Sequence, residues 1–324
     1  MIRKRKEIIK IKRYIAKRIL QLIPILIGIT ILSFGLMRLS SVDAVDKIYE
    51  DGAAAASEQS KEALREELGL NDPFPVQYFN WIKGIAKGDM GTSYILKKPV
   101  INEFLDRLPQ TLLLSLCTII ETILLSVPLG VLCAVRKGKI TDYIIRFACF
   151  IGNSMPGFFV ALIFLYVFSL KLNLFPVISN GHGIEDMILP SLTLALAMSA
   201  KYIRQIRAAV LEELDKEYVT GLKSRGVSNN RILYVSVLKC AFLTIITLLG
   251  MSIGSLLGGT AIVETIFMVN GVGKMGIDAI MKMDYPMIQA YVIWMAVIFV
   301  LINLITDIIY NYLDPRIRLN KDVW

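Results

Sequence analysis

The chain has 324 residues, of which 55% are hydrophobic and 19% are charged, and its formal net charge is +9. Soluble globular proteins usually carry a higher charged fraction, so this composition favours a protein that crosses a membrane several times. The basic residues gather beside apolar runs, as the cytoplasmic flanks of membrane helices do, and the net charge therefore does not indicate a nucleic-acid partner.

Residues 1–18 are strongly basic and precede an apolar run at 19–37. A cleavable signal peptide also begins with a basic region. This run is longer than a typical signal core, and no small-residue cleavage site follows it. We therefore expect a cytoplasmic N-terminus at 1–18 and a first transmembrane helix at 19–37.

Residues 38–108 form a hydrophilic segment rich in Asp and Glu. An acidic segment suits the outer face of the membrane, because loops retained in the cytoplasm are rich in Lys and Arg. Within this extracytoplasmic segment we expect a surface helix over Ser57–Leu68 and a turn over Asn71–Pro75. A further helix should place the apolar side chains from Tyr78 to Ile85 at the membrane interface.

The core, residues 109–312, contains five further apolar stretches, and the sequence thus predicts an all-α polytopic membrane protein with about six transmembrane helices. Pro109 leads into the second span, Pro156 predicts a kink in the third, and the polar stretch 264–286 resembles a re-entrant loop. Six spans place the N-terminus and residues 313–324 in the cytoplasm, whereas five result if the stretch from Met187 is only half buried. The five stretches lie at 111–135, 145–170, 187–203, 241–263 and 287–310.

A charged loop, residues 204–239, separates the fourth and fifth predicted spans. Its apolar residues recur every three or four positions, which predicts one face of an amphipathic helix. Gly226 stands where a helix often ends, because glycine tolerates the left-handed turn, and Ser228 is placed to cap a second helix. The helix either offers its apolar ridge to a soluble partner or packs only on its own protein. The ridge comprises Val210, Leu211, Leu214, Tyr218 and Leu222.

Glycines recur every four residues in the fifth predicted span, at Gly250, Gly254 and Gly258. Such a row lets a second helix approach closely. The second helix belongs either to this chain or to a sister subunit.

Glu121 lies near the middle of the second predicted span, where a carboxylate facing lipid costs at least ~2.5 kcal/mol. Thr118, Thr122 and Ser126 recur around it at helical spacing and extend a polar stripe. In one interpretation the stripe faces the bundle interior, and Glu121 borders a substrate path that favours cations. In the other, Glu121 makes a structural pair with a basic residue of a neighbouring helix or of a sister subunit.

Motifs for chemistry are weak throughout the sequence. Residues 271–276 match the dinucleotide fingerprint by letter, but they lie in a predicted outer loop and lack the strand and helix that the fingerprint requires. No phosphate-binding loop occurs, and His182 is the only histidine. We therefore expect no catalytic residue, no metal site and no cofactor bound by this chain.

Short motifs run through nearly the whole length of the chain, and in their order and spacing they are specific. They are Leu68–Pro73, Gly88–Ser93, Leu108–Leu112, Ser154–Phe158, Ile188–Pro190, Glu217–Gly226, Val263–Phe267, Gly271–Gly273, Asp284–Pro286 and Leu313–Arg316. With these motifs the chain resembles the integral-membrane permease of a bacterial ATP-binding-cassette (ABC) importer, in the dipeptide, oligopeptide and nickel group.

The resemblance implies a type I permease fold in the bacterial cytoplasmic membrane, with the charged loop as the coupling loop. The short helix of this loop would dock on an ATPase subunit, although Leu222 and Ser224 stand where alanines are usual in the family. The residues that the resemblance assigns to coupling are Glu217, Tyr218, Val219, Leu222, Lys223, Arg225 and Gly226.

The resemblance also implies partners: a sister permease in a heterodimer, two ATPase subunits that bind ATP and Mg, and an extracytoplasmic binding protein. The cargo would be nickel, a metal chelate or short peptides. An ion-coupled secondary transporter is the alternative, but it usually needs inverted repeats and several buried acids, and the sequence shows neither. A membrane enzyme would need a catalytic cluster, and none is visible.

The predicted topology places Ser57 outside the cell and Ser228 in the cytoplasm. Single cysteines at these two positions, in a background without the native cysteines, should react oppositely with a membrane-impermeant thiol reagent. Labelling of position 228 in intact cells would overturn the topology.

Overall fold

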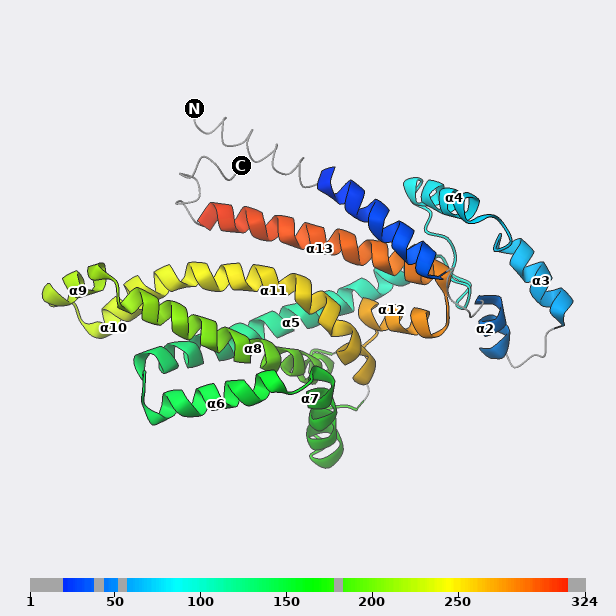
Figure 1. Ribbon diagram of the computed structural model, residues 1–324. Coiled ribbons are helices and arrows are strands. Elements are labelled where there is room, and N and C mark those ends of the chain that lie inside the picture. The colour runs from blue at the N-terminus through cyan, green and yellow to red at the C-terminus, as the bar shows by residue number, and fades with distance from the viewer. Residues whose placement is uncertain (1–19, 38–43, 52–56, 178–182, 314–324) are drawn as a thin grey trace, which may run out of the picture. The chain divides into compact units, whose positions relative to one another are not determined.

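The computed structural model describes residues 20–37, 44–51, 57–177 and 183–313, and these residues form helices joined by short connections (Figure 1). The described part contains no strand, only an isolated antiparallel bridge between Thr92 and Pro99. The all-α class is therefore confirmed. The predicted cytoplasmic segments 1–18 and 314–324 and the loop residue His182 lie outside the described residues.

The helices are the first helix Leu20–Met37, α2 Ala44–Asp51, α3 Glu58–Glu67, α4 Phe74–Ala86, α5 Val100–Val135, α6 Ile140–Ser154, α7 Gly157–Phe164, α8 Glu185–Leu214, α9 Glu217–Ser224, α10 Asn229–Arg231, α11 Leu238–Ile266, α12 Val272–Met281 and α13 Tyr285–Leu313. Two π-helical segments, Leu165–Lys171 and Ile232–Val237, continue α7 and α10. The predicted surface helix corresponds to α3. In its first turn the backbone N–H of Ser60 donates to the Ser57 side chain at 3.2 Å.

Three described helices are long and apolar enough to cross a membrane: Leu20–Met37, α5 and the part Tyr285–Thr306 of α13. The α6–α7 pair adds a fourth crossing if it is one broken span. The apolar stretch of α8 is short, because Asp186 and Lys201 bound it. With α8 and α11 covering the remaining two stretches, the count of six spans stays a prediction.

The predicted kink at Pro156 is confirmed, and the change of direction there is larger than a kink within one helix. The axes of α6 and of α7 with its π-helical continuation meet at 102°. Met155, the residue before the proline, has an extended backbone with ψ 133°, because the proline ring disfavours the helical conformation of its predecessor. The chain therefore changes direction here instead of continuing as one helix.

The helix that contains the second predicted span begins before that span. α5 begins at Val100 and includes Pro109, which the sequence placed at the helix start. Proline removes one helical hydrogen bond, but the turns before it are held by other contacts. Val100 and Phe104 are buried in an apolar cluster, and Arg107 pairs with Glu103 at 2.8 Å.

The chain forms two compact units. The first comprises residues up to Pro109 together with 271–301, and its core joins the start of α5 to α12 and α13. Phe104 stacks on Trp294 with ring centroids 4.6 Å apart. Distant parts of the sequence thus meet in one apolar cluster.

A polar latch ties residues 93–96 to the residue before α13. The Ser93 hydroxyl donates to the buried carboxylate of Asp284, and the Tyr94 N–H donates to the same carboxylate at 3.1 Å. The Ser93 oxygen in turn accepts from the Leu96 N–H at 2.9 Å. A buried carboxylate needs such donors, so the latch fixes this turn within the first unit.

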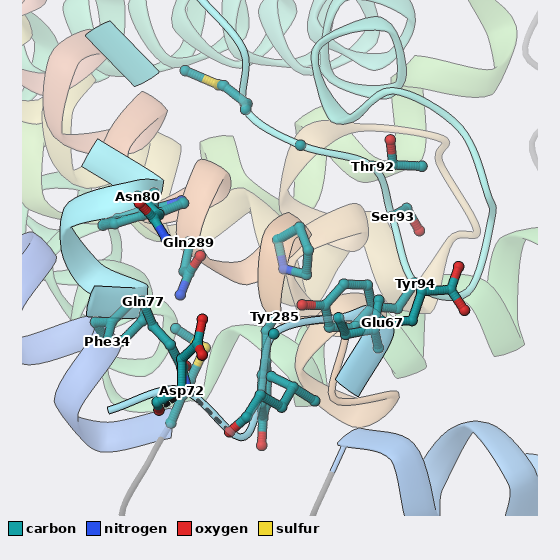
Figure 2. A pocket seen from close by; sticks show the side chains of 18 of the residues that line it. Phe34, Glu67, Asp72, Gln77, Asn80, Thr92, Ser93, Tyr94, Tyr285 and Gln289 are labelled. Carbon is teal, nitrogen blue, oxygen red and sulfur yellow. Dashed lines mark hydrogen bonds between the residues drawn. The ribbon is translucent and has the colours of Figure 1, made fainter. Parts of the chain in front are cut away.

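The first unit contains a cavity of about 550 Å³ next to the latch (Figure 2). Its walls come from the first helix, from the α3–α4 region, from residues 90–97 and from the start of α13. Trp81, Tyr94 and Tyr285 supply aromatic surface, and Gln289 supplies a buried amide. The cavity is thus large enough for a small organic ligand.

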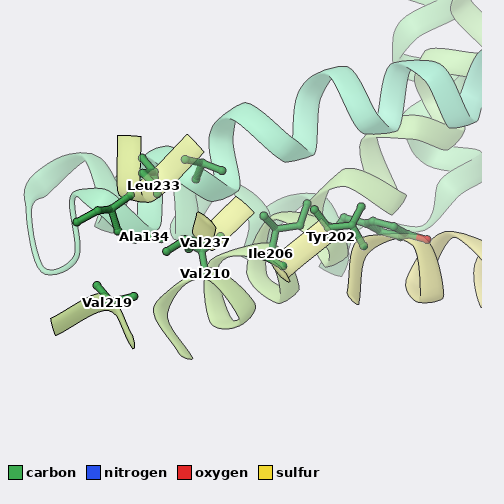
Figure 3. Close-up of a cluster of buried hydrophobic side chains, with 11 residues drawn as sticks. Ala134, Tyr202, Ile206, Val210, Val219, Leu233 and Val237 are labelled. Carbon is green, nitrogen blue, oxygen red and sulfur yellow. The ribbon is translucent and has the colours of Figure 1, made fainter. Parts of the chain in front are cut away.

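The second unit comprises residues 110–270 and those from 302 onward, and α8 and α11 pack side by side within it (Figure 1). Its largest apolar cluster lies where these helices meet α5 and the charged loop (Figure 3). Tyr202 is fully buried in it, and its hydroxyl donates to the Leu248 carbonyl at 2.7 Å. The charged loop is therefore anchored on this apolar cluster.

Candidate functional site

Over residues 210–222 of the charged loop, the end of α8 and the separate helix α9 stand where the sequence predicted one continuous apolar ridge. α8 ends at Leu214, Lys216 is extended with ψ 148°, and α9 begins at Glu217. This break rotates α9 out of register with α8, so Val210 and Leu222 do not share one helix face. The single ridge from Val210 to Leu222 is thus wrong, because a local periodicity cannot show where tertiary packing bends the chain.

The end of α9 at Gly226 is confirmed. Gly226 has φ +75°, in the left-handed region. The Gly226 N–H bonds to the Lys223 carbonyl at 2.9 Å, and the Val227 N–H bonds to the Leu222 carbonyl at 3.1 Å. These two bonds form a Schellman motif, which stops the helix and satisfies its last carbonyls. Ser228 follows at the cap position of α10, but its side chain makes no capping bond.

The apolar residues of α9 face the chain itself. Val219 is 1% exposed and lies in the cluster with Ile206, Val210 and Val237 (Figure 3). Leu222 is half-buried against the same cluster. Both residues therefore anchor α9, and neither offers an apolar ridge to solvent.

The rest of α9 is exposed and mostly polar. Tyr218 lies at its edge, 37% exposed, and its hydroxyl donates to the Glu213 carboxylate at 3.1 Å. Figure 1 shows α9 at the end of the α8–α11 pair, so this surface is available to another molecule. The exposed residues of α9 and its cap are Glu217, Tyr218, Thr220, Gly221, Lys223, Ser224 and Arg225.

A buried ion pair that the sequence analysis missed holds α6 to α8. The Asp142 side chain is 1% exposed, and Arg207 donates to both of its oxygens, at 2.8 and 2.9 Å. The Gly138 N–H adds a third donor at 3.0 Å. Bidentate pairs of this kind fix geometry as well as charge. The pair therefore orients the part of α8 that forms the beginning of the charged loop.

The polar stripe on α5 is buried in the second unit. Thr118, Thr122 and Ser126 are each at most 1% exposed. Thr118 bonds to the Leu114 carbonyl of its own helix at 2.8 Å, but the hydroxyls of Thr122 and Ser126 have no partner within the described ranges. An unsatisfied buried hydroxyl costs about 1–3 kcal/mol. The stripe is thus a costly feature inside an otherwise apolar helix.

Glu121 is half-buried beside this stripe. Its Oε1 accepts a hydrogen bond from the Ser191 hydroxyl of α8 at 2.8 Å, and its Oε2 has no partner among the described residues. Within this described part of the chain no basic side chain pairs with Glu121. A structural pair with a neighbouring helix of the same chain is therefore absent there, whereas a pair with another subunit stays open.

The three glycines of α11 have different surroundings. A side chain at Gly250 would overlap Thr306 of α13, so this glycine packs within the subunit. Gly254 is buried. Gly258 is exposed, and an added Cβ would have no atom within 4 Å. Close approach within this chain is thus seen at Gly250, and helix packing at Gly258 stays a prediction.

Two family models match the chain. The model described as "Binding-protein-dependent transport system inner membrane component" covers residues 126–319. The model described as the N-terminal part of such a membrane component covers residues 11–115. Together they span both compact units.

Curated relatives match over nearly their whole length. The oligopeptide transport system permease protein AppB of Bacillus subtilis is 39% identical over 315 residues, which cover 94% of this chain and 99% of that protein. The nickel import system permease protein NikB of Staphylococcus aureus is 37% identical over 302 residues, which cover 93% and 90%. The two relatives thus carry different cargo names at similar identity.

A solved structure with the same fold is an inward-facing conformation of the MetNI methionine ABC transporter. It aligns with a TM-score of 0.54 at 16% identity, over 65% of this chain and 96% of the aligned chain. At this identity the likeness concerns the fold alone.

Proposed function

The chain belongs to the family of binding-protein-dependent transport system inner membrane components, and from this premise we propose that it forms half of the translocation path of an ATP-driven importer. Its relatives are ABC importer permeases for peptides and nickel, and this membership favours import over the alternative of an ion-coupled secondary transporter. The cargo is nickel, a metal chelate or short peptides.

The observation that carries the mechanism is the way α9 is held. Val219 anchors it to the core, and the Schellman motif at Gly226 ends it sharply. A helix held in this way transmits force as a rigid body, whereas a loose loop would not. The exposed polar surface of α9 is the coupling surface for a partner ATPase.

The partners follow from the family. A sister permease completes the path as a heterodimer, two ATPase subunits bind ATP and Mg, and an extracytoplasmic binding protein delivers the cargo. The permease family itself is non-catalytic, and hydrolysis takes place on the ATPase subunits. The chain spans the cytoplasmic membrane several times, with both termini and the charged loop in the cytoplasm.

Glu121, Thr118 and Ser126 border the path inside the second unit. Glu121 Oε2 and the Ser126 hydroxyl have no hydrogen-bond partner among the described residues, so both are available to bond with a substrate. A carboxylate placed there attracts a cation, either a metal complex or a peptide amine. The Ser191 hydroxyl holds the carboxylate in position.

Replacement of Gly226 tests the coupling role. Gly226→Val forces a β-branched residue into the left-handed region, which costs roughly 1–2 kcal/mol. Gly226→Asn is the matched control, because asparagine tolerates this conformation and an added Cβ meets no atom within 4 Å. We expect the valine variant to insert normally but to lose most cargo-stimulated ATP hydrolysis, and the asparagine variant to retain it. Equal, normal hydrolysis and uptake by both variants would refute the coupling role.

Replacement of Glu121 tests the path. Glu121→Gln keeps the shape and removes the charge, so uptake of nickel or of a lysine-containing tripeptide should fall about tenfold, equivalent to ~1.4 kcal/mol. Glu185→Gln, an exposed change at the start of α8, is the control and should have no effect. Normal transport at all ionic strengths by an assembled importer that carries Glu121→Gln contradicts the path role, and failed assembly favours a pair with another subunit.

A further inference from the structure

Gln289 is a polar side chain of low exposure in the wall of the first unit's cavity. Gln289 is only 7% exposed and lines the cavity near the start of α13 (Figure 2). Its amide makes no hydrogen bond to any other residue in the described part of the chain. The amide atoms are not among the buried unpaired atoms of the described residues and lie in the cavity wall, so the Gln289 amide can bond to a group that enters the cavity.

Charged side chains of both signs line the same cavity. Glu67 is the last residue of α3, and Lys97 belongs to the turn after the polar latch. Neither side chain makes an ion pair within the described ranges. Asp72 is a second carboxylate in the lining. Carboxylates and an ammonium in one cavity complement a ligand that carries a positive and a negative group.

Aromatic surface makes up much of the remaining wall. Tyr94 and Tyr285 lie with ring centroids 6.4 Å apart, and Trp81 faces the cavity from α4. Burial, followed by the neighbouring Asp284 carboxylate, raises the pKa of Tyr94 to about 12. The phenol thus stays protonated at neutral pH and is available as a hydrogen-bond donor. Such walls pack against aliphatic groups and tolerate different ligand shapes.

We infer that this cavity is a binding site for a short zwitterionic peptide. The Gln289 amide has one acceptor and donor hydrogens, which complement the N–H and C=O of a peptide bond. Glu67 pairs with the terminal ammonium and Lys97 with the terminal carboxylate, while the aromatic walls contact the side chains. The choice of peptide as ligand class rests on the proposed import function, but the site itself lies outside the Glu121 stripe.

The cavity volume is consistent with this ligand. A volume of about 550 Å³ falls within the range typical of small-molecule sites. The site would hold the ligand on the outer side of the permease under the proposed topology. It thereby adds a recognition step in this chain to the selection made by a binding protein.

The test uses the full-length chain in nanodiscs without ATP or partner proteins. Isothermal titration calorimetry with tri-alanine, N-acetyl-tri-alanine and tri-alanine amide separates the two terminal charges. The unmodified chain should bind tri-alanine about tenfold more tightly than either blocked peptide. Tri-alanine heat equal to that of empty nanodiscs overturns the site, as does displacement of tri-alanine by added phospholipid, which would identify a lipid cavity.

Four variants assign the individual contacts. Glu67→Gln should abolish the preference for the free amine, and Glu66→Gln, an exposed neighbour that does not line the cavity, should preserve it. Lys97→Asn should abolish the preference for the free carboxylate, because asparagine tolerates the φ of +55° found there. Gln289→Leu should weaken all three peptides alike. Unchanged preferences in the Glu67→Gln and Lys97→Asn variants contradict the assignment.

ATP-driven uptake by the assembled importer separates this inference from the proposed function. Uptake without any tri-alanine binding to the chain refutes the cavity site and leaves the import function intact. Binding with the expected charge preferences, but without ATP-driven uptake, supports the site and refutes the import function.

Discussion

The burial of Val219 in the apolar core of the second unit is the interaction on which the proposed coupling surface depends. It fixes one side of α9 against α8 and α11, so that the polar side of the same short helix must face outward. The left-handed turn at Gly226 then limits the helix to its eight residues. The buried Asp142–Arg207 pair orients the α8 segment that packs in this apolar core. Movement of α9 would therefore be transmitted to the helices of the bundle.

The polar groups inside the helices are the second constraint. An apolar core excludes hydroxyls and carboxylates unless they are bonded, yet α5 buries Thr122 and Ser126 without partners among the described residues. Glu264, in contrast, is fully buried and has a partner: its carboxylate accepts a hydrogen bond from the Thr111 hydroxyl at 2.8 Å. The contrast within one unit separates buried polar residues that have partners from those that have none among the described residues.

Local features were predictable from the sequence. The end of α9 at Gly226 and the break at Pro156 each depend on the backbone preference of one or two residues. Long-range features were not predictable in this way. The break between α8 and α9 depends on the packing of Val219 in the apolar cluster of the second unit. The Asp142–Arg207 pair joins residues 65 positions apart. The cavity around Gln289 combines four separate segments, so no single stretch of sequence reveals it.

A photo-cross-linking residue at Thr220 tests the central claim most directly, because Thr220 lies on the exposed side of α9 next to the buried Val219. In the assembled importer it should cross-link to an ATPase subunit. The same residue at Phe79, which is 66% exposed on α4, should give no such product. An assembled importer in which position 220 forms no cross-link to an ATPase subunit, while position 79 does, would contradict the account.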